Sequence, residues 1–543
     1  MTLSTWTIAR IARLGPATAR SVSVERDLPV TMTDGTVLLA DRWFADGGDT
    51  GAPVVIVRTP YGRTQTDVIA RLLAERGHTV VVQSCRGTFG SGGEFIPFFD
   101  EEQDGADLLT WLEAQSWATG EWLLFGVSYL GLTAWAMKRR SPRAIGAMAL
   151  AVTSTDFRRA VIWPSGRFGL SNGISWRYGL RHQELTGIHL RRAQLLETRT
   201  IRAATRDGYA QDADIRAFGE PDQPYRSWLA HDDRDPWWDR IDFDGEGDSV
   251  PPLLQVAGWY DLFLDAQVDD YIRIRDAGRP VRLVIGPWVH GSLGLFTNAL
   301  RETVELFTGA RDRSDARIWF GGVRRWVNMP AYPPRNAPTR WSLGADGSLT
   351  QSGSEMPEGA AGERELPDDG SPAPAVGGRT LFRADAGRKD QRAREKRPDV
   401  LTYTTAPIEH DIAIAGWPTA QLAVAGSDGR PWFVRLCDVS PTGGSSNVCD
   451  GTVPASDDRD LRDEESGERR TVDIRLSPTA HVFRRGHRIR LQVSNDASPT
   501  YARVDAAARP RLVFSDTDGA SGVDMPLVAL RRGRRPSPTA GPR

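Results

Sequence analysis

Short apolar runs that alternate with helix-spaced segments are the feature that most constrains the fold of this chain. Between residues 53 and 152, each apolar run is separated from the next by a segment with turn or helix spacing. Continuous apolar strands that alternate with helices are typical of a mostly parallel sheet with both faces covered. The runs are "PVVIVRTP" (53–60), "TVVVQSC" (79–85), "WLLFGVS" (122–128) and "AIGAMALAV" (144–152).

The same pattern returns after a long interruption, in "PPLLQVAGWYD" (251–261) and "RPVRLVIGPWVHG" (279–291). The intervening residues are rich in Arg, Trp and Asp and lack strand-like runs, which indicates a helical insertion. A chain of 543 residues also predicts roughly three domains, at about 150 residues each. We therefore predict an α/β fold whose sheet is interrupted by an insertion and then completed.

Five segments follow from these changes in pattern. Residues 22–154 and 246–345 are predicted to form the two parts of the α/β body, and residues 155–245 a helical cap. Residues 346–399 have the Gly, Pro, Ser and acidic composition of a linker. From 400 to 530 the apolar runs are short, alternating and bounded by turns, which predicts a β-sandwich or jelly roll.

Charge, cysteine content and the N-terminal segment restrict the class of function. A net charge of −2 provides no bulk field toward nucleic acid or a membrane surface. Three cysteines without a CxxC pair are too few for a disulfide scaffold, which favours a cytoplasmic protein. Arg10 and Arg13 interrupt residues 1–20, where a secretory signal needs an unbroken apolar core. We expect no metal, cofactor, nucleic-acid partner or membrane span, and a homo-oligomer is compatible with the sequence.

The stretch "FGVSYLG" (125–131) places a serine where a predicted strand gives way to a predicted helix. A strand–Ser–helix turn is the nucleophile elbow of α/β-hydrolases, and it requires small neighbours. Gly126 precedes Ser128 by two residues, but Leu130 stands where the usual pattern has a second glycine, and Gly131 follows one later. Ser128 is thus either a nucleophile or a small residue in an ordinary loop.

Two further residues make the nucleophile hypothesis stronger. A serine hydroxyl needs a base, and the base needs a carboxylate that orients it. In α/β-hydrolases these partners follow in the order Asp, then His, in loops after the carboxyl ends of strands. Asp261 and His290 each stand directly after a buried-strand pattern downstream of Ser128. A helix N-cap and a hydrogen-bonded loop histidine are the alternative roles, but all three residues in this order predict a catalytic triad.

An oxyanion hole is also required for acyl transfer. One donor is expected to be the backbone N–H of Tyr129, the residue after the proposed nucleophile. The other should come from the loop after the run "PVVIVRTP", where the hydroxyl of Tyr61 can donate. A tyrosine packed in a turn is the alternative interpretation of Tyr61.

Three tryptophans are candidates for the substrate pocket. Trp259 and Trp288 lie within two residues of Asp261 and His290, and Trp163 falls in the predicted cap. Core packing is the alternative role for each of them. As pocket residues they favour an apolar or aromatic acyl group.

Motifs along most of the chain resemble those of the cocaine esterase and X-prolyl dipeptidyl-peptidase family. They are "RTPYGR" (58–63), "RGTFGSGGEF" (86–95), "GVSYLG" (126–131), "GWYD" (258–261), "GPWVHG" (286–291), "KRPDVLTYTT" (396–405) and "FRRGHRIRLQVS" (483–494). The resemblance runs from about residue 22 to residue 530. One departure is "QSCRG", because many relatives have an acid near the position of Cys85.

This resemblance implies an α/β-hydrolase body, a helical cap and a carboxy-terminal jelly roll. By the matching motifs it also implies Ser128 as nucleophile, Asp261 as orienting acid and His290 as base. Tyr61 and the Tyr129 N–H are implied as the oxyanion donors.

Three functional hypotheses remain open. The favoured one is a serine esterase that cleaves small or medium esters with an apolar or aromatic acyl group. An amidase, an acylase or an X-prolyl dipeptidyl aminopeptidase would need carboxylates near the site to bind a substrate amine. A non-catalytic binding protein is the hypothesis from another class. The candidate carboxylates of the cap are Asp156, Glu184, Asp232 and Asp233.

Overall fold

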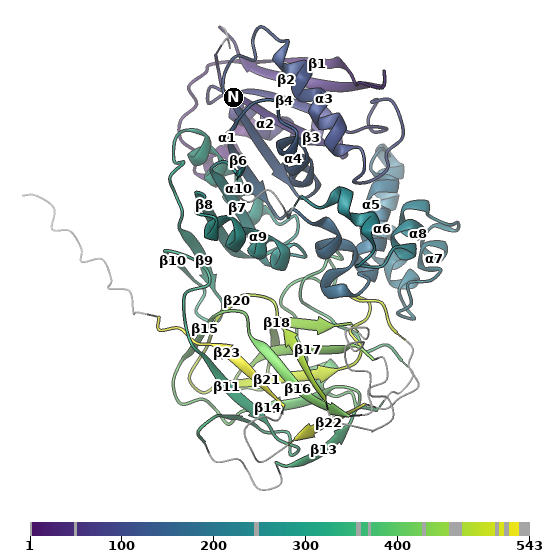
Figure 1. Ribbon diagram of the computed structural model, residues 1–543, viewed down its shortest axis with the longest axis vertical. Helices are drawn as coiled ribbons and strands as arrows, with labels where there is room; N and C mark the ends of the chain where they lie inside the picture. The colour runs from purple at the N-terminus through teal and green to yellow at the C-terminus, as the bar shows by residue number, and fades with distance from the viewer. Residues whose placement is uncertain are drawn as a thin grey trace, which may run out of the picture.

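The computed structural model shows a helix-covered sheet, a projecting group of helices and a β-rich region below them (Figure 1). The structure describes residues 3–47, 51–243, 249–354, 360–367, 371–425, 430–454, 470–504, 510–514 and 521–530.

A ten-stranded sheet forms the first of these parts, in the order β1-β2-β4-β3-β5-β6-β7-β8-β9-β10. Its neighbours from β4 to β9 run parallel, whereas β1, β2 and β10 pair antiparallel at the two edges. The central strands β3 and β4 are buried along their whole length, which explains their continuous apolar sequences. The strands are β1 (Val22–Thr31), β2 (Val37–Ala45), β3 (Val54–Thr59), β4 (Thr79–Ser84), β5 (Trp122–Val127), β6 (Ile145–Ala151), β7 (Leu253–Tyr260), β8 (Val281–Val289), β9 (Ala316–Phe320) and β10 (Arg325–Met329).

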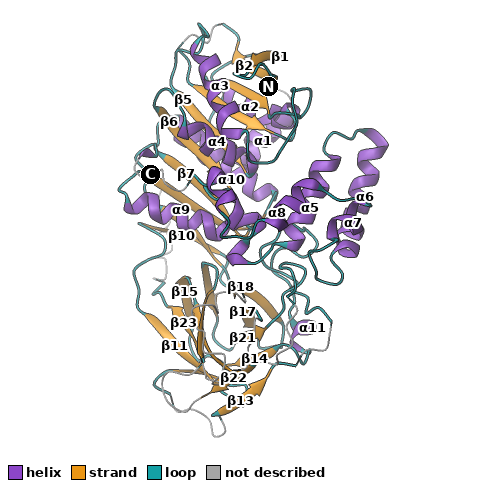
Figure 2. Cartoon of the chain, turned by 45° about the vertical axis from the view of Figure 1, so that its right-hand side comes forward, coloured by secondary structure: helices purple, strands orange, loops and turns teal. Residues whose placement is uncertain are grey.

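Helices cover this sheet on its two faces (Figure 2). Helix α1 contacts both α2 and α10, while α3 packs on α4, and α4 lies against β3, β5 and β6. Residues that follow β3, β5, β7 and β8 border a cavity that is also lined by residues of the segment between β6 and β7. The helices are α1 (Leu3–Ala12), α2 (Asp67–Ala74), α3 (Glu101–Glu113), α4 (Tyr129–Arg139), α9 (Leu264–Asp276) and α10 (Leu293–Phe307), with a short turn η1 (Arg63–Thr66) before α2.

The segment between β6 and β7 is helical, as its composition predicted, and it projects beside the sheet (Figure 2). Helix α5 is the innermost of this group, and most of its residues are buried. The backbone N–H of Ser171 on α5 donates to the carbonyl of Pro499 in the β-rich region. The elements are η2 (Arg158–Ile162), η3 (Pro164–Gly166), α5 (Leu170–His182), α6 (Gly187–Ala204), α7 (Ala213–Phe218), α8 (Gln223–Ala230) and η4 (Pro236–Ile241).

The β-rich region is a sandwich of antiparallel sheets with its own apolar core. A seven-stranded sheet in the order β12-β11-β23-β16-β22-β13, with β19 paired to β16, faces a four-stranded sheet in the order β14-β21-β17-β18. Strand β20 pairs with β15, and Gly321 after β9 bonds to the β20 backbone. The strands are β11 (Pro338–Leu343), β12 (Leu349–Gln351), β13 (Gly362–Glu365), β14 (Leu401–Thr404), β15 (Ile412–Gly416), β16 (Thr419–Ala425), β17 (Trp432–Val439), β18 (Ser445–Val453), β19 (Arg470–Arg475), β20 (Thr479–Phe483), β21 (Arg488–Ser494), β22 (Arg511–Phe514) and β23 (Gly522–Pro526).

The segment predicted as a linker, residues 346–399, differs from that expectation in its described parts. Strands β12 and β13 and the short helix α11 (Arg392–Glu395) lie within it, and β13 pairs with β22 of the sandwich. Strand β11 also belongs to the sandwich, although residues 338–343 were predicted as part of the body. Short edge strands tolerate Gly, Pro and acidic residues, so composition alone did not reveal them.

The described residues contain no candidate for a membrane-spanning helix. None of the helices there combines the length and the apolar character that a bilayer crossing requires.

Candidate active site

Ser128 lies in a strained turn between β5 and α4. Its φ of +58° and ψ of −125° are rare for a residue with a side chain. A Cβ on Gly126 would lie 2.3 Å from the carbonyl oxygen of Leu130, and one on Gly131 would lie 2.4 Å from Thr153. The close approach thus falls on position 131 rather than 130, which explains how leucine is accepted where the usual motif has glycine.

Ser128, His290 and Asp261 form a continuous chain of hydrogen bonds at the carboxyl ends of β5, β8 and β7. The Ser128 Oγ lies 3.1 Å from Nε2 of His290, and Nδ1 of His290 lies 2.8 Å from Oδ2 of Asp261. The other carboxylate oxygen of Asp261 accepts from the backbone N–H of Phe263 at 2.9 Å. A carboxylate only accepts, so Nδ1 of His290 carries the proton, and Nε2 is left to accept from the serine hydroxyl.

Tyr61 lines the same cavity as Ser128, and Tyr129 follows Ser128 in the chain. Tyr61 follows β3, and its hydroxyl accepts from the indole N–H of Trp176 at 3.1 Å. Burial raises the pKa of the Tyr61 hydroxyl, so it is a protonated donor at neutral pH. Tyr129 is the first residue of α4, where backbone N–H groups have no acceptor within the helix.

The side chain of Tyr129 is held by a buried network beneath the turn. Its hydroxyl donates to Oε1 of Glu101 at 3.0 Å and accepts from the N–H of Phe98 at 2.7 Å. Oε2 of Glu101 pairs with the fully buried guanidinium of Arg58 and accepts from the thiol of Cys85 at 3.5 Å. Burial raises the pKa of the Cys85 thiol. The cysteine at this departure from the family pattern is therefore a neutral donor to a carboxylate.

A small cavity of about 50 Å³ opens beside Ser128 and His290. Apart from Tyr61, Ser128 and His290, its described lining is apolar or aromatic. The cap and the β7–α9 loop contribute most of the hydrophobic side chains beside the serine. Leu381, in the segment between β13 and α11, contributes one more. These side chains are Phe157, Val161, Trp176, Leu262, Phe263 and Leu381.

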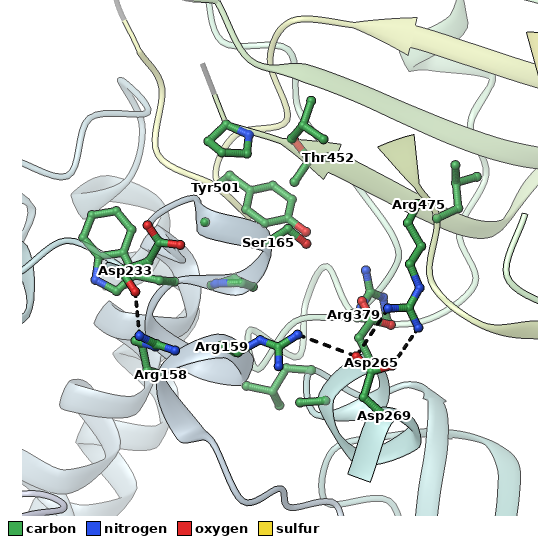
Figure 3. A pocket seen from close by; sticks show the side chains of 18 of the residues that line it. Arg158, Arg159, Ser165, Asp233, Asp265, Asp269, Arg379, Thr452, Arg475 and Tyr501 are labelled. Atoms are coloured by element: carbon green, nitrogen blue, oxygen red, sulfur yellow. Dashed lines mark hydrogen bonds and ion pairs between the residues drawn. The ribbon is translucent and has the colours of Figure 1, made fainter. Parts of the chain in front are cut away.

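The three tryptophans predicted for the substrate pocket lie elsewhere. Trp163 lines a second, larger cavity of about 450 Å³ between the body, the cap and the sandwich (Figure 3). The indole N–H of Trp259 donates to the carbonyl of Trp319 on β9, and Trp288 packs beside Trp326 of β10. The aromatic lining that sequence reasoning missed is Trp176, which stands 48 residues after Ser128 on α5, with Phe157 and Phe263.

The carboxylates of the cap that could bind a substrate amine are all engaged away from the small cavity. Asp156 pairs with Arg158 at 3.0 Å, and Glu184 accepts from the N–H of Phe89. Asp232 accepts from the backbone of Arg234, and Asp233 lines the larger cavity.

Comparison with known proteins identifies the family. Residues 34–292 match the X-Pro dipeptidyl-peptidase (S15 family), and residues 308–531 match the X-Pro dipeptidyl-peptidase C-terminal non-catalytic domain. A cocaine esterase from Rhodococcus sp. (strain MB1 Bresler) is 31% identical over 533 residues, which cover 89% of this chain and 92% of the relative. The chain belongs to the S15 family. This S15 protein is therefore a hydrolase of the serine type, and the resemblance predicted from its motifs is confirmed.

Solved structures confirm the predicted fold of this S15 family member. An aminopeptidase from a marine sediment archaeon, Thaumarchaeota archaeon, superposes with a TM-score of 0.76 at 20% identity and covers 94% of this chain and 97% of its own. An α-amino acid ester hydrolase also superposes with a TM-score of 0.76 at 20% identity, covering 95% of this chain and 98% of its own. This chain shares the α/β-hydrolase body and the C-terminal β-sandwich with these proteins.

Proposed function

We propose that this protein hydrolyses carboxylic esters with a short, apolar acyl group through an acyl-enzyme on Ser128. One observation carries the choice of substrate. Within the described residues, the cavity beside Ser128 is lined by apolar and aromatic side chains and by no carboxylate. The named activity of the cocaine esterase relative, an ester hydrolase, supports the same choice.

The proposed mechanism uses the five polar groups around the cavity. His290 accepts the proton of Ser128 as the serine oxygen attacks the carbonyl carbon, and Asp261 stabilises the imidazolium that forms. The Tyr61 hydroxyl and the Tyr129 N–H donate to the oxyanion of the tetrahedral intermediate. The intermediate collapses, and the alcohol leaves with the proton from His290. Water then attacks the acyl-enzyme by the same steps, which releases the acid and restores the serine.

The absence of a charged partner argues against the X-prolyl dipeptidase alternative. A dipeptidyl substrate brings a free ammonium group to the acyl side of the serine, and an unpaired charge in an apolar cavity is costly. No described residue of the lining is a carboxylate. The carboxylate of Asp261 is buried and is already hydrogen-bonded to Nδ1 of His290. An uncharged ester has no such requirement, and apolar side chains favour its acyl chain.

A direct comparison of substrates tests this proposal. We expect p-nitrophenyl butyrate to be hydrolysed with a kcat/KM at least about a hundredfold above that of a dipeptidyl-prolyl anilide, on the scale of the discrimination produced by an unmet polar requirement. The Ser128→Ala protein measured in parallel corrects for background hydrolysis. Dominant cleavage of the anilide would overturn the ester assignment, and loss of neither activity in the variant would overturn the role of Ser128.

We also propose a cytoplasmic location, which the state of the cysteines supports. Cys85, Cys437 and Cys449 are all buried free thiols. Proteins of oxidising compartments generally use such residues in disulfides. Cell fractionation with an antibody tests the location, and recovery in a secreted fraction would contradict it.

A further inference from the structure

Trp176 contacts the oxyanion hole from outside the hydrolase body. It lies on α5 of the cap, is buried, and lines the cavity beside Ser128. Its indole nitrogen Nε1 lies 3.1 Å from the hydroxyl oxygen of Tyr61. Tyr61 and Ser128 line the same cavity. Tyr61 therefore contacts a cap residue and shares a cavity with the residue that we propose as nucleophile.

The chemistry of the two groups fixes the direction of the first of these bonds. An indole N–H only donates, whereas a tyrosine hydroxyl has one proton to donate and lone pairs that accept. The Tyr61 oxygen must therefore accept from Trp176. Its own proton is directed away from the indole, toward Ser128 and the position where the oxyanion develops. A donor on the hydroxyl oxygen also polarises the O–H bond, which strengthens it as a donor.

We propose that Trp176 is a positioning residue for the reaction, whose indole N–H sets the direction in which Tyr61 donates its proton. This inference rests on the proposed role of Tyr61 as an oxyanion donor. It makes the cap a part of the catalytic apparatus, because the orientation of a group in the body then depends on a residue of α5.

The surroundings of Trp176 hold the indole in this orientation. Its ring stacks on Trp228 of α8, with 5.4 Å between the ring centroids and an angle of 10° between the planes. Phe98, from the loop before α3, packs on it at 5.2 Å. The ring is therefore contacted by both the cap and the body, so its N–H is fixed before substrate binds. Preorganised donors of this kind are the ones that lower a transition-state barrier most.

A double-mutant cycle tests the inference. Trp176→Phe keeps an aromatic ring and removes the N–H. We expect kcat on p-nitrophenyl butyrate to fall about tenfold, the scale of one neutral hydrogen bond, with KM changed by less than about threefold. In the Tyr61→Phe background the same substitution should lower kcat by less than about twofold, because no hydroxyl is left to orient.

The matched control is Trp228→Phe, which reduces the packing behind Trp176 without removing the N–H that contacts Tyr61. Its effect on kcat in the wild-type background should be well below that of Trp176→Phe, because the indole N–H remains and Phe98 still packs on the ring. An equal loss from Trp176→Phe in both backgrounds would show that the indole only fills space, and would overturn the inference while leaving the role of Tyr61 intact. Near-normal turnover of Tyr61→Phe itself would remove Tyr61 from the oxyanion hole, and the inference would fall with it.

Discussion

The two cavities that meet at Leu262 differ in size and in chemistry. The one beside Ser128 is about 50 Å³ and mostly apolar, whereas the one at the junction of the three parts is about 450 Å³ and lined by arginines and aspartates (Figure 3). Volume alone favours the larger as a ligand site, because such sites usually measure about 300–1,000 Å³. The smaller one nevertheless contains Ser128, His290 and Tyr61, which the proposed mechanism uses.

The charges of the larger cavity are matched to one another across the parts of the chain. Asp265 and Asp269 stand one turn apart on α9, and both face arginines from other regions. Asp265 pairs with Arg379, while Asp269 lies 2.6 Å from Arg475 and 3.6 Å from Arg159. The larger cavity is therefore a junction that ties α9 to the cap and the sandwich, and α9 begins three residues after Asp261. Three pairs of residues, one at the proposed catalytic site and one of the same type in this junction cavity, allow the two cavities to be compared by substitution.

The serines give the largest expected contrast. Ser128→Ala should lower kcat by about 10⁶, the scale on which loss of a triad nucleophile acts. Ser165 lines the junction cavity, and Ser165→Ala should leave kcat within about twofold. Both are measured on p-nitrophenyl butyrate, with labelling by a fluorophosphonate probe as a second measurement. Labelling at Ser165, or persistent labelling of Ser128→Ala, would show that the chemistry had been assigned to the wrong cavity.

The aspartates give the next contrast. Asp261→Asn should lower kcat by about 10⁴, because an amide can donate to Nδ1 of His290 and so stabilise the wrong tautomer. Asp265→Asn, in the junction cavity, should lower kcat by less than about threefold. Thermal unfolding of both variants shows whether each remains folded. A comparable loss from both substitutions would indicate that α9 as a whole, rather than the orienting carboxylate, controls the reaction.

The tyrosine hydroxyls give a contrast of intermediate size. Tyr61→Phe should lower kcat by about 10²–10³, the usual effect of removing one oxyanion donor. Tyr501 is buried in the wall of the junction cavity, and burial raises the pKa of its hydroxyl to about 12. Tyr501→Phe should leave kcat within about twofold. Equal turnover by the two variants on p-nitrophenyl butyrate would exclude Tyr61 from the transition state.

The proximity of Ser128, Asp261 and His290 could be predicted because the sheet, rather than the distance along the chain, brings them together. Ser128, Asp261 and His290 each follow a strand whose apolar run is evident in the sequence. The carboxyl ends of parallel strands share one edge, so residues in these places converge despite the cap inserted between them.

The pocket could not be predicted in the same way, because proximity in sequence does not set the direction of a side chain. Trp288 is two residues from His290, but a Cβ on Gly286 would lie 2.5 Å from its ring, so it fills the space above that glycine. Trp259 is drawn toward β9 by its bond to the carbonyl of Trp319. Trp176 reaches the serine only through the packing of α5 on the body, and helical spacing does not reveal which loop a helix faces.

The smallest expected effect comes from the ion pairs of the junction cavity itself. Arg475 is half exposed, and it pairs with Asp269 and stacks over Trp417 at 4.3 Å. Exposed pairs of this kind contribute at most about 1 kcal/mol and are screened by salt. Arg475→Ala should therefore lower the free energy of unfolding by about that amount at low ionic strength, as followed by urea unfolding, and by less in about 1 M salt.

Arg475→Ala should change kcat by less than about twofold. Asp269→Asn should give the same small effects on stability and on kcat, because Asp269 is the ion-pair partner of Arg475. The two cavities differ in function only if both substitutions leave kcat nearly unchanged. A loss of turnover of a hundredfold or more from either substitution, with the protein still folded, would mean that the junction transmits its state along α9 to Asp261. The larger cavity would then be part of the catalytic site, and the contrast between the two would disappear.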